Sequence, residues 1–170
     1  MSDLRSAPVP PLDADDHVRG PDAAPLLIVY ADLECAYCAA LHLRLEEVRA
    51  GRPLRIAYRH FPVRSSHPRA WAAACATEAA ELQGRFWEMH DAILADQGHM
   101  EDPHLWALAG RLGLDLDRFE HDRRSDAVIE RVRRDFSGGV RAGVATTPTV
   151  FVDGRAYAGT SLRSLLAELG

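Results

Sequence analysis

Two cysteines are separated by two residues in the segment Cys35-Ala36-Tyr37-Cys38, where a short apolar run is followed by an amphipathic stretch. The run over residues 26–30 is hydrophobic throughout, a pattern typical of a central strand buried on both faces. Beyond the cysteines, Leu41, Leu45 and Val48 recur at helical spacing and predict a helix that covers the sheet. The sequence therefore places a dithiol at a strand-to-helix corner, which is the geometry of a redox-active pair.

Length and charge limit the kinds of protein that this chain can be. Its 170 residues suffice for one domain with a sizeable core, and 47% hydrophobic and 26% charged residues are ordinary for a globular protein. The formal net charge of -5 gives no indication of nucleic-acid binding. No run approaches the ~18 apolar residues of a membrane span, so no membrane partner is expected.

The N-terminal segment and the cysteine count bear on the location of the protein. Residues 1–25 contain aspartates and prolines but no hydrophobic stretch, so no secretory signal is expected and a cytoplasmic location is predicted. That compartment disfavours structural disulfides, and three cysteines cannot all pair within one chain. Residues 1–20 are expected to form an extended or mobile arm.

The pattern after this arm changes from strand to helix. Residues 54–61 alternate as a second strand that Pro62 ends, with Arg59 on the face opposite to the apolar one. Residues 66–143 have a helical pattern throughout. Within them, the pair Asp102-Pro103 and the residue Ser125 are each predicted to begin a helix.

The C-terminal part returns to strand patterns. Residues 149–152 and 155–158 predict two strands, and Asp153-Gly154 between them suits a two-residue hairpin turn. Ser161 is predicted to cap a last helix. The first two strands can run parallel through the helix between them, whereas the last two must be antiparallel because their turn is so short.

This order of elements predicts an α/β thioredoxin fold with an inserted helical domain. Residues 21–65 and 144–170 are expected to form the thioredoxin-like domain. Residues 66–143 are expected to form the insertion, between the second strand and the C-terminal β-β-α unit.

The predicted helix start explains how one cysteine becomes reactive. A thiolate attacks disulfides far better than a thiol does, and a helix N-terminus stabilises negative charge. The helix dipole supplies up to ~2 kcal/mol, which lowers a pKa by only about one unit. A larger drop requires direct N–H donors, for example from Tyr37 or Cys38. We expect Cys35 to be the exposed nucleophile and Cys38 the more buried resolving thiol.

A second feature with chemical consequences is Thr146-Thr147-Pro148-Thr149, where a proline directly precedes a predicted strand. A cis bond between Thr147 and Pro148 would turn the Thr147 backbone groups outward. There they can pair with a bound peptide beside Cys35. The predicted fold, rather than the local sequence, implies this cis bond.

Together these motifs resemble the DsbA family of thiol–disulfide oxidoreductases. The likeness runs from about Pro21 to Gly170 and is greatest to cytosolic DsbA-like proteins related to domains fused to NhaA-type antiporters. It is carried by four segments: Tyr30 to Cys38, Arg59-His60-Phe61-Pro62, Gly84 to His90, and Gly143 to Gly154.

The resemblance implies roles for the motif residues. It makes Cys35 the nucleophile, Cys38 its partner, and Thr147 and Pro148 the cis-proline site for substrate. It implies no metal or organic cofactor. Its partners are protein or small-molecule thiols and disulfides, together with a cellular reductant or oxidant. Many relatives have proline where this chain has Ala36, and alanine both frees φ and adds an N–H near the sulfur, so the redox potential stays open.

The cysteines also allow interpretations other than redox chemistry. A C-x-x-C pair can be half of a zinc site, with His42 as a third ligand, but structural zinc takes four ligands and no second C-x-x-C is present. Cys75 shares a helix face with Trp71 and is expected to be a packing residue. Asp32 and Glu34 flank the motif, and three roles stay open for them. Either can transfer protons or raise the thiol pKa by like-charge repulsion, or be simply exposed.

Two functions from other classes remain as alternatives. One is a redox-inactive thioredoxin-fold module that uses the Thr147-Pro148 groove to bind peptides without turnover. The other is a glutathione-dependent isomerase or transferase, which generally does not need both cysteines.

Overall fold

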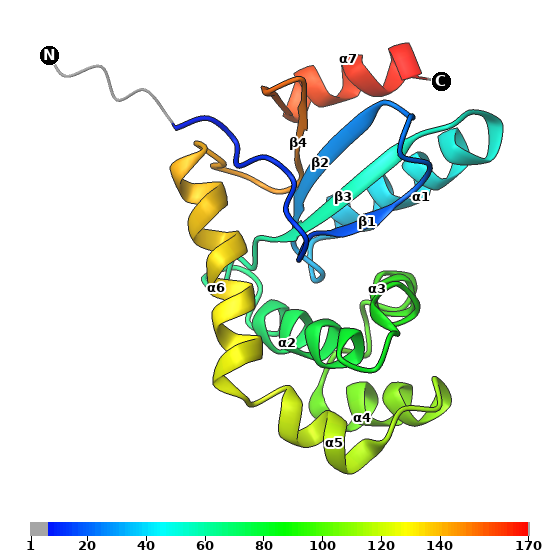
Figure 1. Cartoon of the computed structure of the whole chain (residues 1–170), viewed down its shortest axis with the longest axis vertical. Helices are drawn as coiled ribbons and strands as arrows, with labels where there is room; N and C mark the ends of the chain where they lie inside the picture. Colours follow the sequence, from blue (N-terminus) through cyan, green and yellow to red (C-terminus); the bar gives the residue numbers. More distant parts are fainter. Residues whose placement is uncertain (1–6, 170) are drawn as a thin grey trace, which may run out of the picture.

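The computed structural model describes residues 7–169, which form a five-stranded sheet and the helices around it (Figure 1). The strand order is β1-β3-β2-β4-β5. The elements follow one another as β1 (His17–Arg19), β2 (Leu26–Ala31), α1 (Ala36–Gly51), β3 (Arg55–His60), α2 (Ala70–Glu81), α3 (Phe86–Ala95), α4 (Asp102–Arg111), α5 (Leu116–Asp122), α6 (Asp126–Arg141), β4 (Thr149–Val152), β5 (Arg155–Ala158) and α7 (Gly159–Leu169).

The sheet has the predicted directions. β2 and β3 are parallel and joined through α1, while β4 pairs antiparallel with both β2 and β5. The turn between β4 and β5 consists of Asp153 and Gly154, whose φ angles of 48° and 78° are both positive, as a tight hairpin turn requires. The predicted thioredoxin fold with a helical insertion is therefore confirmed.

Alternation along the strands divides the core between the two faces of the sheet. Leu27, Val29 and Tyr58 belong to a large cluster with α1, α7 and the first helices of the insertion. Tyr30 and Phe151 belong to a second cluster on the opposite face, which Phe136 of α6 contacts. In Figure 1, α6 runs from the other helices of the insertion to the sheet.

Two helices of the insertion begin at or within one residue of their predicted starts. Ser125 caps α6 by accepting a hydrogen bond from the Val128 amide, at 3.3 Å. α4 includes Asp102 and is capped by Glu101, so the predicted start was displaced by one residue. Cys75 packs against Val128 within the insertion, which confirms its packing role. No helix within residues 7–169 combines the length and the apolar character that crossing a bilayer requires.

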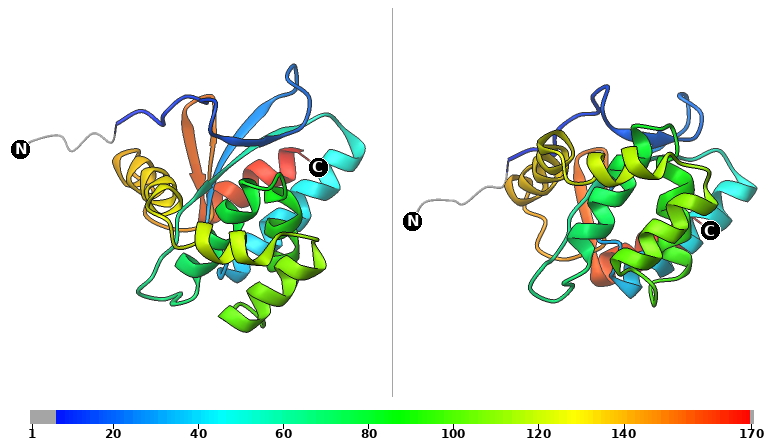
Figure 2. Two further views of the ribbon diagram at one scale, coloured as in Figure 1. Left: turned by 60° about the horizontal axis from the view of Figure 1, so that its bottom comes forward. Right: turned by 90° about the horizontal axis from the view of Figure 1, so that it is seen from below.

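One strand, β1, was not predicted from the sequence; it lies in the expected N-terminal arm and pairs antiparallel with β3. Arg59 is buried and holds this arm. Its guanidinium pairs with Asp16 at 2.7 Å and donates to the carbonyls of Pro10 and Pro11 at 2.8 Å. Nearer the N-terminus, the Ala7 amide donates a hydrogen bond to the carbonyl of Arg141, the last residue of α6. The arm therefore runs beside that helix (Figure 2). Residues 1–6 of the arm lie outside the described residues.

Candidate active site

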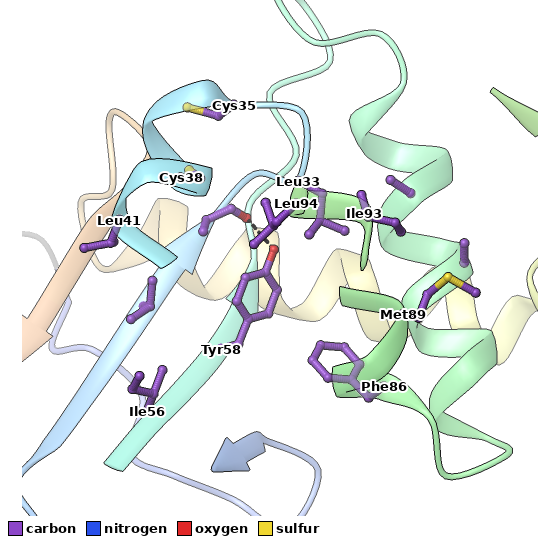
Figure 3. Packing of buried hydrophobic residues seen from close by; sticks show 14 of the residues in the cluster. Leu33, Cys35, Cys38, Leu41, Ile56, Tyr58, Phe86, Met89, Ile93 and Leu94 are labelled. Atoms are coloured by element: carbon purple, nitrogen blue, oxygen red, sulfur yellow. Dashed lines mark hydrogen bonds between the residues drawn. The ribbon is translucent and has the colours of Figure 1, made fainter. Parts of the chain in front are cut away.

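The dithiol occupies the start of α1, as predicted. Cys35 is the N-cap residue, with φ -78° and ψ 119°, and the helix begins at Ala36. The Cys35 carbonyl accepts hydrogen bonds from the amides of Cys38 and Ala39, at 3.0 and 3.2 Å. Figure 3 shows both cysteines on this first turn, at the edge of the large hydrophobic cluster. The two sulfurs are not bonded to each other.

The expectation that Cys35 is exposed was wrong. Only 4% of Cys35 is accessible to solvent, against 3% of Cys38, while Tyr37 between them is 78% exposed. One contact at this sulfur is long-range, because the Thr147 carbonyl, 112 positions further along the chain, lies 3.6 Å from it. The sequence placed Thr147 near the dithiol but did not indicate how closely this loop covers the sulfur.

The two thiols differ strongly in acidity. A hydrogen bond from the Cys38 thiol makes the largest contribution to lowering the pKa of Cys35 to about 5, against the opposing effect of burial. The Cys38 amide, the Thr147 side chain and the Tyr37 amide lower this pKa further. Burial in turn raises the pKa of Cys38 well above its ordinary value. The Cys38 and Tyr37 amides are donors of the kind expected at this helix start, but the Cys38 thiol contributes more than either.

A groove runs beside the dithiol. The Thr147-Pro148 peptide bond is cis, and β4 begins directly after it. The Thr149 hydroxyl donates to the Thr146 carbonyl at 2.7 Å within this turn. The groove has a volume of about 440 Å³. Its lining includes Tyr37, Leu41, Thr147, Pro148, Leu162 and Leu166.

Asp32 and Glu34 tie the dithiol loop to the segment that follows β3. The buried Asp32 carboxylate accepts from the Val63 amide at 2.7 Å and from His67 at 2.9 Å. Glu34 accepts from the amide and the guanidinium of Arg69, at 2.7 and 2.8 Å. The Asp32 amide also donates to the Cys38 sulfur at 3.4 Å. Arg69 was missed, because nothing in the local sequence connects a residue thirty-five positions away to this loop.

Two clusters have metal-binding residue types, and neither includes a cysteine sulfur. They are His17, His60 and Glu78, and His42, His90 and Asp91. In each cluster a guanidinium lies near the carboxylate, where it competes with a cation. Arg131 is 4.0 Å from Glu78, and Arg19 is 2.7 Å from Asp91. Both histidines of the first cluster already bond to Glu78, at 2.7 and 3.0 Å. Neither cluster includes a cysteine, so within residues 7–169 the alternative of a zinc site built on the C-x-x-C pair gains no support.

Solved structures with the same fold include thiol–disulfide proteins. A thioredoxin-like oxidoreductase from Silicibacter pomeroyi superposes with a TM-score of 0.81 at 21% identity, covering 92% of this chain and 91% of its own. The thiol-disulfide exchange protein alpha-DsbA2 from Wolbachia pipientis gives 0.78 at 18% identity, covering 93% and 89%. At these identities the likeness establishes the fold, and it confirms the expected resemblance to DsbA-like proteins.

Relatives by sequence are much longer proteins. The Na(+)/H(+) antiporter NhaA of Herminiimonas arsenicoxydans is 45% identical over 163 residues, which are 94% of this chain and 26% of the antiporter. An NhaA 1 antiporter of Salinispora arenicola is 46% identical over 156 residues, or 88% and 24%. The chain thus spans about a quarter of the length of the curated relatives that it matches.

The family itself follows from the match over nearly the whole chain. The sequence profile described as Thioredoxin matches residues 13–167. This range contains all five strands, the dithiol and the cis-proline turn. The chain therefore belongs to the thioredoxin family.

Proposed function

We propose that this protein is a thiol–disulfide oxidoreductase that exchanges disulfides with protein or small-molecule thiols through Cys35 and Cys38. The observation that carries the proposal is the position of Cys35 at the N-terminus of α1, 3.6 Å from the Thr147 carbonyl of the cis Thr147-Pro148 turn. The lowered pKa of Cys35, about 5, favours its thiolate at neutral pH. Cys38, one helical turn on, holds its proton and is placed to act second.

In the reducing direction, the Cys35 thiolate attacks one sulfur of a substrate disulfide. A mixed disulfide forms at Cys35, and the other substrate sulfur leaves as a thiolate. Cys38 then loses its proton and attacks the Cys35 sulfur. This step releases the second substrate thiolate and leaves a Cys35–Cys38 disulfide. A cellular reductant must return two electrons to the pair, and the oxidising direction is the reverse of these steps.

The groove beside the dithiol supplies the substrate site of this proposal. Thr147 and Pro148 line it together with Tyr37 of the motif, and Ala36 lies next to Tyr37 in the helix. The exposed Tyr37 ring and the leucines of α7 offer an apolar surface to a peptide that carries the reacting cysteine. The Thr147 backbone is proposed to pair with that peptide as an added strand does.

Reduction of insulin by dithiothreitol tests the proposal, with wild type, Cys35→Ser and Cys75→Ser compared side by side. We expect wild type and Cys75→Ser to accelerate the reaction and Cys35→Ser to be inactive. Absence of acceleration by wild type would favour the peptide-binding module. Activity on a small electrophile that survives Cys38→Ser would favour the glutathione-dependent enzyme.

The direction of exchange depends on the compartment. The cytoplasmic location stays a prediction, and in a reducing cytoplasm we propose that reduction or isomerisation predominates over net oxidation. The redox potential of the dithiol in a glutathione buffer tests this point. A potential well above the cytosolic poise would keep the pair reduced there and would require a dedicated oxidant for oxidation of substrates.

A further inference from the structure

One side chain of the helical insertion reaches into the dithiol loop. Gln97 follows α3, and its amide nitrogen donates to two backbone carbonyls, that of Leu33 at 2.8 Å and that of Cys35 at 3.0 Å. Gln97 is partly buried, and Leu33 is buried. The insertion therefore holds the backbone on both sides of Glu34, directly before α1 begins.

The Cys35 carbonyl is a sensitive point for such a contact. It is the N-cap carbonyl, which also accepts from the amides of Cys38 and Ala39 in the first turn of α1. Fixing this carbonyl fixes the orientation of the first turn, to which the Tyr37 and Cys38 amides belong. These amides are among the groups that stabilise the Cys35 thiolate.

We propose that Gln97 is a positioning residue of the dithiol, which keeps the first turn of α1 in the conformation that Cys35 needs to react. This inference rests on the proposed function and adds a specific means by which the insertion controls the reacting sulfur. Loss of Gln97 frees the turn and leaves the Leu33 carbonyl without this donor. The freed turn holds the Tyr37 and Cys38 amides less firmly toward the sulfur, so the expected direction is a weaker acid at Cys35.

The chain offers a matched control in Gln83, its other glutamine. Gln83 also makes two hydrogen bonds to backbone, donating to the Asp115 carbonyl at 3.2 Å and accepting from the Asp115 amide at 2.9 Å. Those bonds join two parts of the insertion and do not touch the dithiol loop. Gln83→Ala therefore removes similar contacts without the proposed connection to Cys35.

The experiment titrates the Cys35 thiolate by its ultraviolet absorbance and by the rate of iodoacetamide alkylation, in wild type, Gln97→Ala, Gln97→Asn and Gln83→Ala. We expect Gln97→Ala to raise the pKa of Cys35 by about one unit, which slows alkylation about tenfold at a pH below both pKa values. Gln97→Asn, whose shorter amide reaches the carbonyls less well, should shift in the same direction. Gln83→Ala should keep the wild-type titration even where its melting temperature falls.

The outcomes separate this inference from the proposed function. An unchanged titration in Gln97→Ala overturns the inference, as does an equal shift in Gln83→Ala. If Gln97→Ala fails to fold, Gln97→Asn decides, and a wild-type titration there also overturns the inference. An ordinary thiol pKa at Cys35 of the wild type would instead contradict the proposed function.

Discussion

Replacing Cys35 by serine should remove a pH-dependent contribution to the stability of the reduced protein. Folding lowers the pKa of Cys35 from an ordinary 9.0 to about 5, so the folded state favours the thiolate. For an acid shifted in this direction, the stabilisation is complete above the unfolded pKa. It declines as the pH falls and disappears below the folded pKa. The relevant window therefore lies between about pH 5 and about pH 9.

The size of the effect follows from how steeply the free energy of unfolding changes with pH within this window. Each pH unit changes the free energy of unfolding by up to ~1.4 kcal/mol when one proton separates the two states. Because half of the thiols are still protonated at the folded pKa, the gain from about pH 5 to about pH 7 is about 2 kcal/mol. Serine does not titrate in this range, so the unfolding free energy of Cys35→Ser lacks this pH-dependent rise. Any difference from wild type that is independent of pH does not affect the comparison.

The assay is urea unfolding of wild type, Cys35→Ser and Cys75→Ser under reductant at several pH values. Measurements stay below about pH 8, because the raised pKa of Cys38 acts with the opposite sign above the pKa of an unfolded cysteine. Cys75→Ser should follow the wild-type profile, since the pKa of Cys75 is raised to about 11. A constant difference between wild type and Cys35→Ser from about pH 5 to about pH 7 would refute the reasoning.

Three further predictions concern single positions. Thr147→Val removes a side chain that lowers the pKa of the reactive thiol, so the midpoint of the alkylation–pH profile should move upward. Cys75, 4% exposed and with its pKa raised to about 11, should react with a thiol reagent only after urea is added, as mass spectrometry can determine. Gly139→Ala places a Cβ 2.7 Å from the Phe61 ring and should lower stability by about 1–3 kcal/mol in thermal unfolding. Gly138→Ala, with its nearest atoms at 3.6 Å, is the matched control and should be tolerated.

The parts of the fold that the sequence predicted are those with local causes. The apolar run of β2 and the periodicity of α1 lie next to each other in the chain, so together they fixed the corner where the dithiol sits. Asp153-Gly154 predicted the hairpin because this pair readily adopts the positive φ angles that a two-residue turn requires. Ser125 identified a helix start for the same kind of reason, since its hydroxyl caps an amide three residues away.

The parts that the sequence did not predict depend on contacts between distant segments. β1 is short, and its strand character comes from pairing with β3 rather than from its own residues. Arg59 was assigned to an outward face by alternation. In the folded chain, Asp16 and two proline carbonyls satisfy its charge and allow its burial. The contact between the Cys35 sulfur and the Thr147 carbonyl likewise joins segments 112 positions apart.

The structure also bears on Ala36, for which the sequence left two opposing effects. After the Cys38 thiol, the amides of Cys38 and Tyr37 are among the groups that lower the pKa of Cys35, and the Ala36 amide is not among the largest causes. Ala36 is the first residue of α1, where a proline fits because that amide has no partner within the helix. The sulfur therefore gains little acidity from the added N–H. Ala36→Pro should leave the alkylation midpoint near about pH 5, and any change in redox potential should arise from the backbone freedom that alanine allows.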